Sequence, residues 1–282
     1  MTEPHIRQAY AHCLHLARNH YENFPVASWL LPRRLRQPVA AIYAFARRAD
    51  DWADEGDFPA HERLAALDAM EQSVRASGRG EPGDDPVFIA LADSIQRHAL
   101  PLEPFLDLLS AFRQDVTQTR YADFGELMQY CRRSANPVGR LLLHLYRAAD
   151  ARNLGHADAV CSALQLTNFL QDLHQDYVEN GRVYIPQDEL RRFGVDEAQL
   201  GRREDSPALR QLLRFQTQRA MQILHSGAPL GKRLKGRAGF ELRMIILGGN
   251  RILQYLQRQP DSFQRPRLTR RDRLHMVWGA LK

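Results

Sequence analysis

Two pairs of aspartates are the residues of this sequence best suited to do chemistry. Asp50 and Asp54 form the first pair, and Asp172 and Asp176 form the second. Residues four apart lie on one face of a helix, so each pair places two carboxylates side by side. Carboxylates held so close repel one another unless a cation lies between them. Because oxygen ligands without Cys or His favour Mg²⁺, we predict that all four aspartates bind Mg²⁺.

Polar neighbours extend both pairs into longer stripes. Arg47 precedes Asp50 by one turn, and Gln165 and Asn168 precede Asp172 on the same helical face. A guanidinium beside such a site suits a diphosphate, because it can donate two parallel hydrogen bonds to phosphate oxygens. The alternative interpretation is a solvated, charged helix surface. The two aspartate pairs share the same spacing and each is flanked by apolar residues, which weakens that alternative.

Helical periodicity dominates the chain and predicts an all-α protein. Helices are expected at residues 4–20, 38–55, 59–77, 86–98, 102–118, 123–134, 137–150, 156–179, 206–226, 238–258 and 269–281. No segment shows the alternation of apolar and polar residues that is typical of a strand. No low-complexity tract marks a domain boundary, so we expect a single domain over residues 1–282.

Composition limits the partners and the compartment. The 282 residues carry a net charge of +6, mostly from arginines spread along the chain. This charge suits a diphosphate or an anionic membrane surface, and we do not expect nucleic acid as a partner. The three cysteines lack metal-ligand spacing and are interpreted as reduced thiols. With no signal-peptide core and no apolar run of ~18 residues, we expect a cytoplasmic protein that touches membranes only peripherally.

Two stretches resemble the aspartate-rich motifs of the squalene/phytoene synthase family. They are YAFARRADDWAD at residues 43–54 and QLTNFLQDLHQDYVENGRVYIP at residues 165–186. Tyr130-Cys131, followed by residues 137–139 with the sequence PVG, is similar to a segment between those motifs. The resemblance covers nearly the whole chain. It implies the isoprenoid (terpenoid) synthase fold, with a central hydrophobic cavity and Mg²⁺–diphosphate chemistry.

Within that family, four segments resemble the hydroxysqualene synthases: residues 22–28, 30–36, 130–140 and 242–253. The implied reaction is Mg²⁺-dependent ionisation of presqualene diphosphate, loss of diphosphate, rearrangement of the carbocation and capture by water. Functional coupling to a presqualene diphosphate synthase and a hydroxysqualene reductase would follow. The alternative is a head-to-head prenyl transferase that condenses two prenyl diphosphates. A catalytically inactive relative is disfavoured, because all four aspartates are present.

The resemblance also implies roles for individual residues. Tyr130 matches a tyrosine near the reacting carbons, where an aromatic ring can stabilise a cation. The aspartates act in catalysis through the metal, and the expected substrate contacts are Arg47, Gln165, Asn168, Arg182, Tyr184 and Gly249. Arg182 and Tyr184 lie in the segment that closes over the diphosphate in the family.

Two departures from the family pattern bear on the product. Coupling synthases have a serine-rich segment where this chain has Tyr21-Glu22-Asn23, which favours a substrate with a single diphosphate. Gly248-Gly249 stands where the family has a tyrosine. We consider two interpretations of this glycine pair, namely room for an ordered water near the cation and close helix packing.

The basic helix expected at residues 269–281 carries Leu274, Val277, Trp278 and Leu281. We predict peripheral membrane contact there, with ordinary packing on the domain as the alternative.

Overall fold

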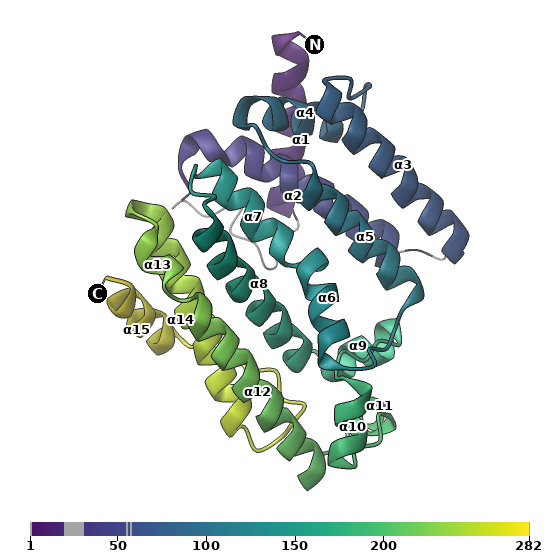
Figure 1. Ribbon diagram of the computed structural model, residues 1–282, viewed down its shortest axis with the longest axis vertical. Helices are drawn as coiled ribbons and strands as arrows, with labels where there is room; N and C mark the ends of the chain where they lie inside the picture. Colours follow the sequence, from purple (N-terminus) through teal and green to yellow (C-terminus); the bar gives the residue numbers. More distant parts are fainter. Residues whose placement is uncertain (1, 20–30, 55, 57, 282) are drawn as a thin grey trace. The chain divides into compact units, whose positions relative to one another are not determined.

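The protein is described by a computed structural model that covers residues 2–19, 31–54, 56 and 58–281. Within these residues the secondary structure is helical, and the only extended pairing is an isolated bridge between Arg120 and Val183 (Figure 1). The all-α prediction is therefore confirmed. The helices are α1 (Glu3–Asn19), α2 (Arg33–Asp54), α3 (Ala60–Arg79), α4 (Pro86–His98), α5 (Glu103–Thr117), α6 (Phe124–Ser134), α7 (Asn136–Leu145), α8 (Ala151–Gln171), α9 (Leu173–Asn180), α10 (Gln187–Phe193), α11 (Ala198–Arg202), α12 (Pro207–Gly227), α13 (Leu230–Arg233), α14 (Gly236–Arg258) and α15 (Arg270–Leu281).

The helices form two compact units. The first contains Met1–Thr117 and Arg140–Ala149, and the second contains Gln118–Gly139 and Asp150–Lys282. The first aspartate pair belongs to the first unit and the second pair to the second. The single domain over residues 1–282 stays a prediction.

Helix α2 is central to the first unit, where it packs against α1, α4, α5 and α3. Its apolar stripe, which includes Ile42 and Phe45, is buried, and the ring of Phe45 meets that of Phe105 edge-on at 5.5 Å. The helix begins at Arg33, five residues before the expected start at Pro38. The additional turn is stable because Leu35 within it is fully buried.

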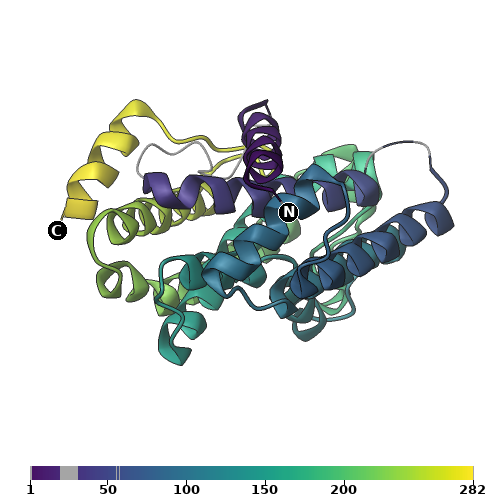
Figure 2. The same cartoon turned by 90° about the horizontal axis from the view of Figure 1, so that it is seen from above.

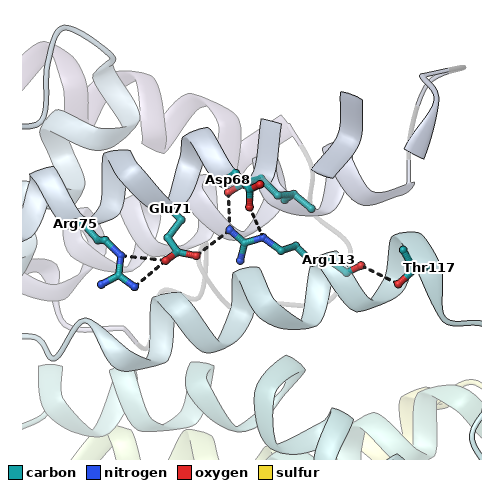
Figure 3. A network of polar contacts seen from close by, with 6 residues as sticks. Asp68, Glu71, Arg75, Arg113 and Thr117 are labelled. Atoms are coloured by element: carbon teal, nitrogen blue, oxygen red, sulfur yellow. Dashed lines mark hydrogen bonds and ion pairs between the residues drawn. The ribbon is translucent and has the colours of Figure 1, made fainter. Parts of the chain in front are cut away.

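Helices α3 and α5 of the first unit are joined by a network of charged side chains (Figure 3). Arg113 on α5 donates to Asp68 and Glu71 on α3, at 2.8 Å to each. Arg75 donates two further hydrogen bonds to Glu71, at 3.0 and 2.7 Å. Hydrogen bonds from Arg75 and Arg113 lower the pKa of Glu71, so this carboxylate stays ionised in moderately acidic solution.

Helix α8 is central to the second unit, where it packs against α12, α14 and α6. Figure 1 shows α8 and α12 side by side. Asp150 caps α8 by accepting a hydrogen bond from the Asn153 N–H, so the helix starts five residues before the expected start at residue 156. The expected single helix 156–179 is wrong at Asp172, where one non-helical residue separates α8 from α9. Aspartate is a weak helix former because its short side chain competes for backbone hydrogen bonds.

We expect Arg113→Met to lower the free energy of unfolding by about 1–2 kcal/mol, because Glu71 and Asp68 lose a shared charged donor. The depressed pKa of Glu71 means that its contribution is present at neutral pH and is lost as the pH falls through the folded-state pKa. The difference from the wild type in urea unfolding should therefore shrink in acid. Arg79→Met, which removes the exposed Arg79–Glu81 pair, is the control and should change little. Equal effects of the two variants would contradict this account.

Candidate active site

The polar stripe of the second motif keeps its helical register through the break at Asp172. The Asp172 N–H donates to the Asn168 carbonyl at 3.0 Å, and the Asp176 N–H donates to the Asp172 carbonyl at 2.8 Å. These are the bonds that an uninterrupted helix would make. Gln165, Asn168, Asp172 and Asp176 therefore follow one another at helical spacing along α8 and α9.

Asp172 is paired with Arg265, which lies in the segment before α15. The ion pair is bidentate: Arg265 Nε lies 2.9 Å from Asp172 Oδ1, and Arg265 Nη2 donates to Asp172 Oδ2 at 3.1 Å. Burial raises the pKa of Asp172, the Arg265 charge opposes that rise, and the Glu179 charge adds to it. A carboxylate that is 19% exposed is stable in its ionised form only beside a cation. Arg265 supplies that cation here.

Sequence reasoning did not find Arg265. It lies 93 residues from Asp172 in the chain and belongs to no recognisable spacing pattern. Within the second unit, Asp172 and Arg265 line a cleft of about 130 Å³, and the guanidinium-bearing Arg203 lines it as well.

Four aromatic rings gather in the second unit, and they include two predicted site residues. Tyr184 stacks on Phe169 with centroids 3.7 Å apart, and Tyr130 lies 5.9 Å from Tyr184 and 6.3 Å from Phe169. Tyr121 lies 5.4 Å from Tyr130 and 5.7 Å from Tyr184. All four are buried. The faces of such rings carry partial negative charge, so the cluster can stabilise a cation.

Backbone hydrogen bonds hold this aromatic cluster together. The Val183 N–H donates to the Thr119 carbonyl at 3.0 Å, and the Gln187 N–H donates to the Tyr121 carbonyl at 2.9 Å. The segment that carries Tyr184 is thus fixed against the segment that carries Tyr121. Sequence reasoning missed Tyr121 and Phe169 as site residues. The only signal for Phe169 was its position directly after Asn168, and Tyr121 gave none.

Arg182 is buried and joined to the second motif through the backbone. Gly181 ends α9 with a positive φ of 60°, which glycine adopts without strain. The turn brings the Arg182 N–H to the Asp176 carbonyl at 2.9 Å. The predicted substrate residue and the second aspartate of the motif are therefore neighbours.

The first motif also holds a guanidinium against its carboxylates. Arg47 Nη1 lies 3.5 Å from Asp50 Oδ2, and Arg47 Nε lies 2.6 Å from Asp51 Oδ1. The closer partner, Asp51, is not part of the predicted stripe. Asp54 is the last residue of α2, and Arg63 stabilises this helix end by donating to the Ala53 carbonyl at 3.0 Å.

The residues of each motif fit Mg²⁺. In the described part of the chain, no three or more His, Cys, Asp or Glu side chains gather as a ready-made metal cage. Mg²⁺ does not need such a cage, because it commonly takes one or two protein carboxylates and completes its shell with phosphate oxygens and water. Each aspartate pair offers that donor set. The first aspartate of each pair also forms an ion pair with an arginine, Asp50 with Arg47 and Asp172 with Arg265. Each pair therefore already attracts a positively charged group.

The glycine pair in α14 is closely packed. A Cβ on Gly249 would lie 2.7 Å from Leu164 Cδ2. A Cβ on Gly248 would lie 3.1 Å from Met276 Cε. Among the described side chains, close packing thus accounts for both glycines, and Gly249 as a substrate contact stays a prediction. Tyr21-Glu22-Asn23, residues 22–28 and Leu30 lie outside the described residues.

Comparison with known proteins decides the family. The sequence pattern of squalene/phytoene synthase matches residues 17–273. The chain belongs to the squalene/phytoene synthase family. A hydroxysqualene synthase from Rhodopseudomonas palustris is 37% identical over 92% of this chain and 88% of its own. A phytoene synthase from Mycobacterium tuberculosis is 36% identical over 84% of this chain and 78% of its own.

The crystal structure of a squalene synthase from Alicyclobacillus acidocaldarius matches with a TM-score of 0.85 and 36% identity. The match covers 92% of this chain and 96% of that one. The predicted isoprenoid synthase fold is confirmed. This member of the squalene/phytoene synthase family is accordingly an enzyme of isoprenoid biosynthesis. These three relatives are named hydroxysqualene, phytoene and squalene synthase.

We expect Arg265→Met to destabilise the protein by about 1–3 kcal/mol, because Asp172 would be left mostly buried without a counter-ion. Amide exchange across residues 260–268 should become faster. A carboxyl whose folded-state pKa is raised binds protons more readily when folded, so the stability deficit should narrow as the pH falls. Hydrogen exchange and urea unfolding measure both effects.

Arg267→Met changes an exposed arginine two residues away and is the matched control. Equal unfolding free energies and equal amide exchange rates in the Arg265 and Arg267 variants would contradict the claim that the Asp172–Arg265 pair holds residues 260–268 in place.

Proposed function

We propose that this enzyme is a hydroxysqualene synthase that acts on presqualene diphosphate. The bond between the carbinyl carbon and the diphosphate oxygen breaks, and its electron pair leaves with diphosphate. The resulting cyclopropylcarbinyl cation rearranges to the squalene skeleton. The oxygen of a water molecule then forms a new bond to carbon, and one proton is released. No reductant is consumed.

The observation that carries the proposal is the junction of a polar stripe and an aromatic cluster on one helix. Asn168 ends one turn of the stripe, and the next residue, Phe169, stacks on Tyr184. The departing diphosphate would meet the polar stripe, and the developing carbocation would meet the aromatic cluster only one residue further along α8. Chemistry that separates these two charges requires both kinds of surroundings.

The anionic half of the reaction would involve the two aspartate motifs. Asp50, Asp54, Asp172 and Asp176 would hold Mg²⁺, which when bound supplies positive charge to the leaving diphosphate. Arg47 and Arg182 would donate hydrogen bonds to phosphate oxygens. Gln165 and Asn168 would orient the diphosphate through their side-chain amides, and Gly249 would lie beside the substrate.

The cationic half would depend on the buried rings. Tyr130 and Tyr184 would turn ring faces toward the carbocation, with Phe169 and Tyr121 behind them. Their burial favours exclusion of bulk water, so that the cation rearranges before it is captured. Capture by a single water would then be the last step.

Two observations favour hydroxysqualene over a coupled product. Relatives that are 37% and 35% identical over 92% and 94% of this chain are named hydroxysqualene synthases. The sequence Tyr21-Glu22-Asn23 lacks the serines that coupling synthases of the family use for a second diphosphate. The alternative is a head-to-head prenyl transferase, which the similarity to a phytoene synthase and a squalene synthase supports. A presqualene diphosphate synthase would supply the substrate, and a hydroxysqualene reductase would consume the product.

Product analysis tests the proposal. We expect purified protein with Mg²⁺ to convert presqualene diphosphate to hydroxysqualene, with the same yield in the presence and absence of NADPH. Farnesyl diphosphate alone should give no coupled product. Asp172→Asn should lower kcat by roughly a hundredfold or more, because a ligand of the charge-stabilising cation is lost. Formation of presqualene diphosphate, squalene or a coupled diene from farnesyl or geranylgeranyl diphosphate alone would overturn the proposal in favour of the alternative.

A further inference from the structure

Helix α15 carries apolar side chains on two opposite faces. Met276, Gly279 and Ala280 lie on the face toward α14, where Ala280 is fully buried. The opposite face carries Leu274, Val277, Trp278 and Leu281, which are 71%, 42%, 68% and 69% exposed. Their spacing of three, one and three residues forms a continuous stripe along a helix. They are four of the six large apolar side chains that are exposed in the described part of the chain.

The orientation of α15 on α14 is set by interlocking side chains. Met276 occupies the space beside Gly248, where an added Cβ would lie 3.1 Å from Met276 Cε. In the other direction, a Cβ on Gly279 would lie 3.1 Å from Leu247 Cδ1. Figure 2 shows α15, in yellow at the C-terminal end, lying alongside α14. Because each helix offers a glycine to its neighbour, α15 cannot rotate its outer stripe inward without losing this packing.

Polar contacts fix both ends of α15 in the same orientation. Asp272 is buried and accepts hydrogen bonds from Arg251 Nε and the Tyr255 hydroxyl, each at 2.7 Å. Hydrogen bonds from Thr269 and Tyr255 hold the pKa of Asp272 well below its usual range, so it stays ionised. At the other end, Arg243 Nε donates to the Ala280 carbonyl at 2.7 Å. The outer stripe is therefore a fixed feature of the surface.

The charged side chains that residues 267–281 expose are all arginines. Arg267, Arg270, Arg271 and Arg273 are exposed. The only acidic residue of the helix, Asp272, is turned inward and neutralised by Arg251. An apolar stripe with an arginine margin and no outward carboxylate is complementary to lipid headgroups that carry negative charge. None of the described helices is long and apolar enough to cross a bilayer, so the contact would lie in the plane of the interface.

We propose that α15 docks this enzyme on anionic lipid bilayers. Leu274, Val277, Trp278 and Leu281 enter the boundary between headgroups and acyl chains, and the arginines bind lipid phosphates. A second copy of the chain fits the stripe less well, because a symmetric pair would bring the arginine margins of two helices together. The inference deepens the proposed function by naming the surface from which a substrate with long hydrocarbon chains would be taken. The evidence for docking does not depend on the product.

Flotation with lipid vesicles tests the docking surface without substrate. We expect the protein to bind vesicles that contain phosphatidylglycerol more tightly than vesicles of phosphatidylcholine alone, and binding should weaken as salt increases. Leu274→Ser combined with Leu281→Ser should weaken binding to anionic vesicles by roughly tenfold or more. Replacing Arg270, Arg271 and Arg273 with Gln should remove the preference for anionic vesicles. The emission of Trp278 should shift to the blue on binding, and Trp278→Phe should abolish that shift.

Two controls separate docking from general effects. Val178→Ser changes an exposed apolar residue on α9, and Arg18, Arg132 and Arg152 changed together to Gln remove the same charge elsewhere. Both should bind vesicles as the wild type does. All variants alter exposed side chains, so their melting temperatures should match that of the wild type.

Equal binding by the α15 variants and the controls would overturn the proposal. So would a dimer in sedimentation analysis that the α15 serine variant dissociates, together with no vesicle binding by the wild type. Because no turnover is measured, either failure is distinct from a failure of the proposed reaction.

Discussion

The arrangement of the second unit depends on a carboxylate that is largely removed from water. Asp172 is held at the junction of α8 and α9, and its ionised form requires a neighbouring cation. Arg265 meets that requirement with two contacts and ties the segment before α15 to the helix that carries the motif. Gln171 reinforces this tie by donating to the Pro266 carbonyl at 3.2 Å. One electrostatic requirement thus organises residues far apart in the chain.

The same helix connects the charged stripe to the aromatic cluster. Phe169 is buried and directly follows Asn168 in α8, and its ring stacks on Tyr184 from the segment after α9. A helix that presents polar groups on one side and an aromatic ring on the adjoining side can serve both partners of a charge separation. Helical geometry allows this arrangement, because the side chains of adjacent residues such as Asn168 and Phe169 point in directions about 100° apart around the helix axis.

Residue spacing predicted the features that form within a single helix. The contacts between segments far apart in the chain became known only from the structure. The helices, the two aspartate pairs and the pairing of Arg47 with Asp50 follow from spacing within one helix. The family motifs named Tyr130 and Tyr184 as site residues, but the contact between their rings was not predicted. Arg265 and Tyr121 could not be predicted, because their roles come from tertiary contacts that leave no periodic signal. The break at Asp172 was equally hidden, since the apolar pattern continues through it.

Calorimetric titration of diphosphate in the presence of Mg²⁺ tests the central claim that the aspartate stripes bind a metal–diphosphate. The account predicts Mg²⁺-dependent binding by the wild type. Asp172→Asn and Asp50→Asn should each weaken it by roughly tenfold or more, because a charged ligand is lost. Asp188→Asn, which changes an exposed carboxylate on α10, should bind as the wild type does. Binding that is independent of Mg²⁺, or equal in all three variants, would contradict the account.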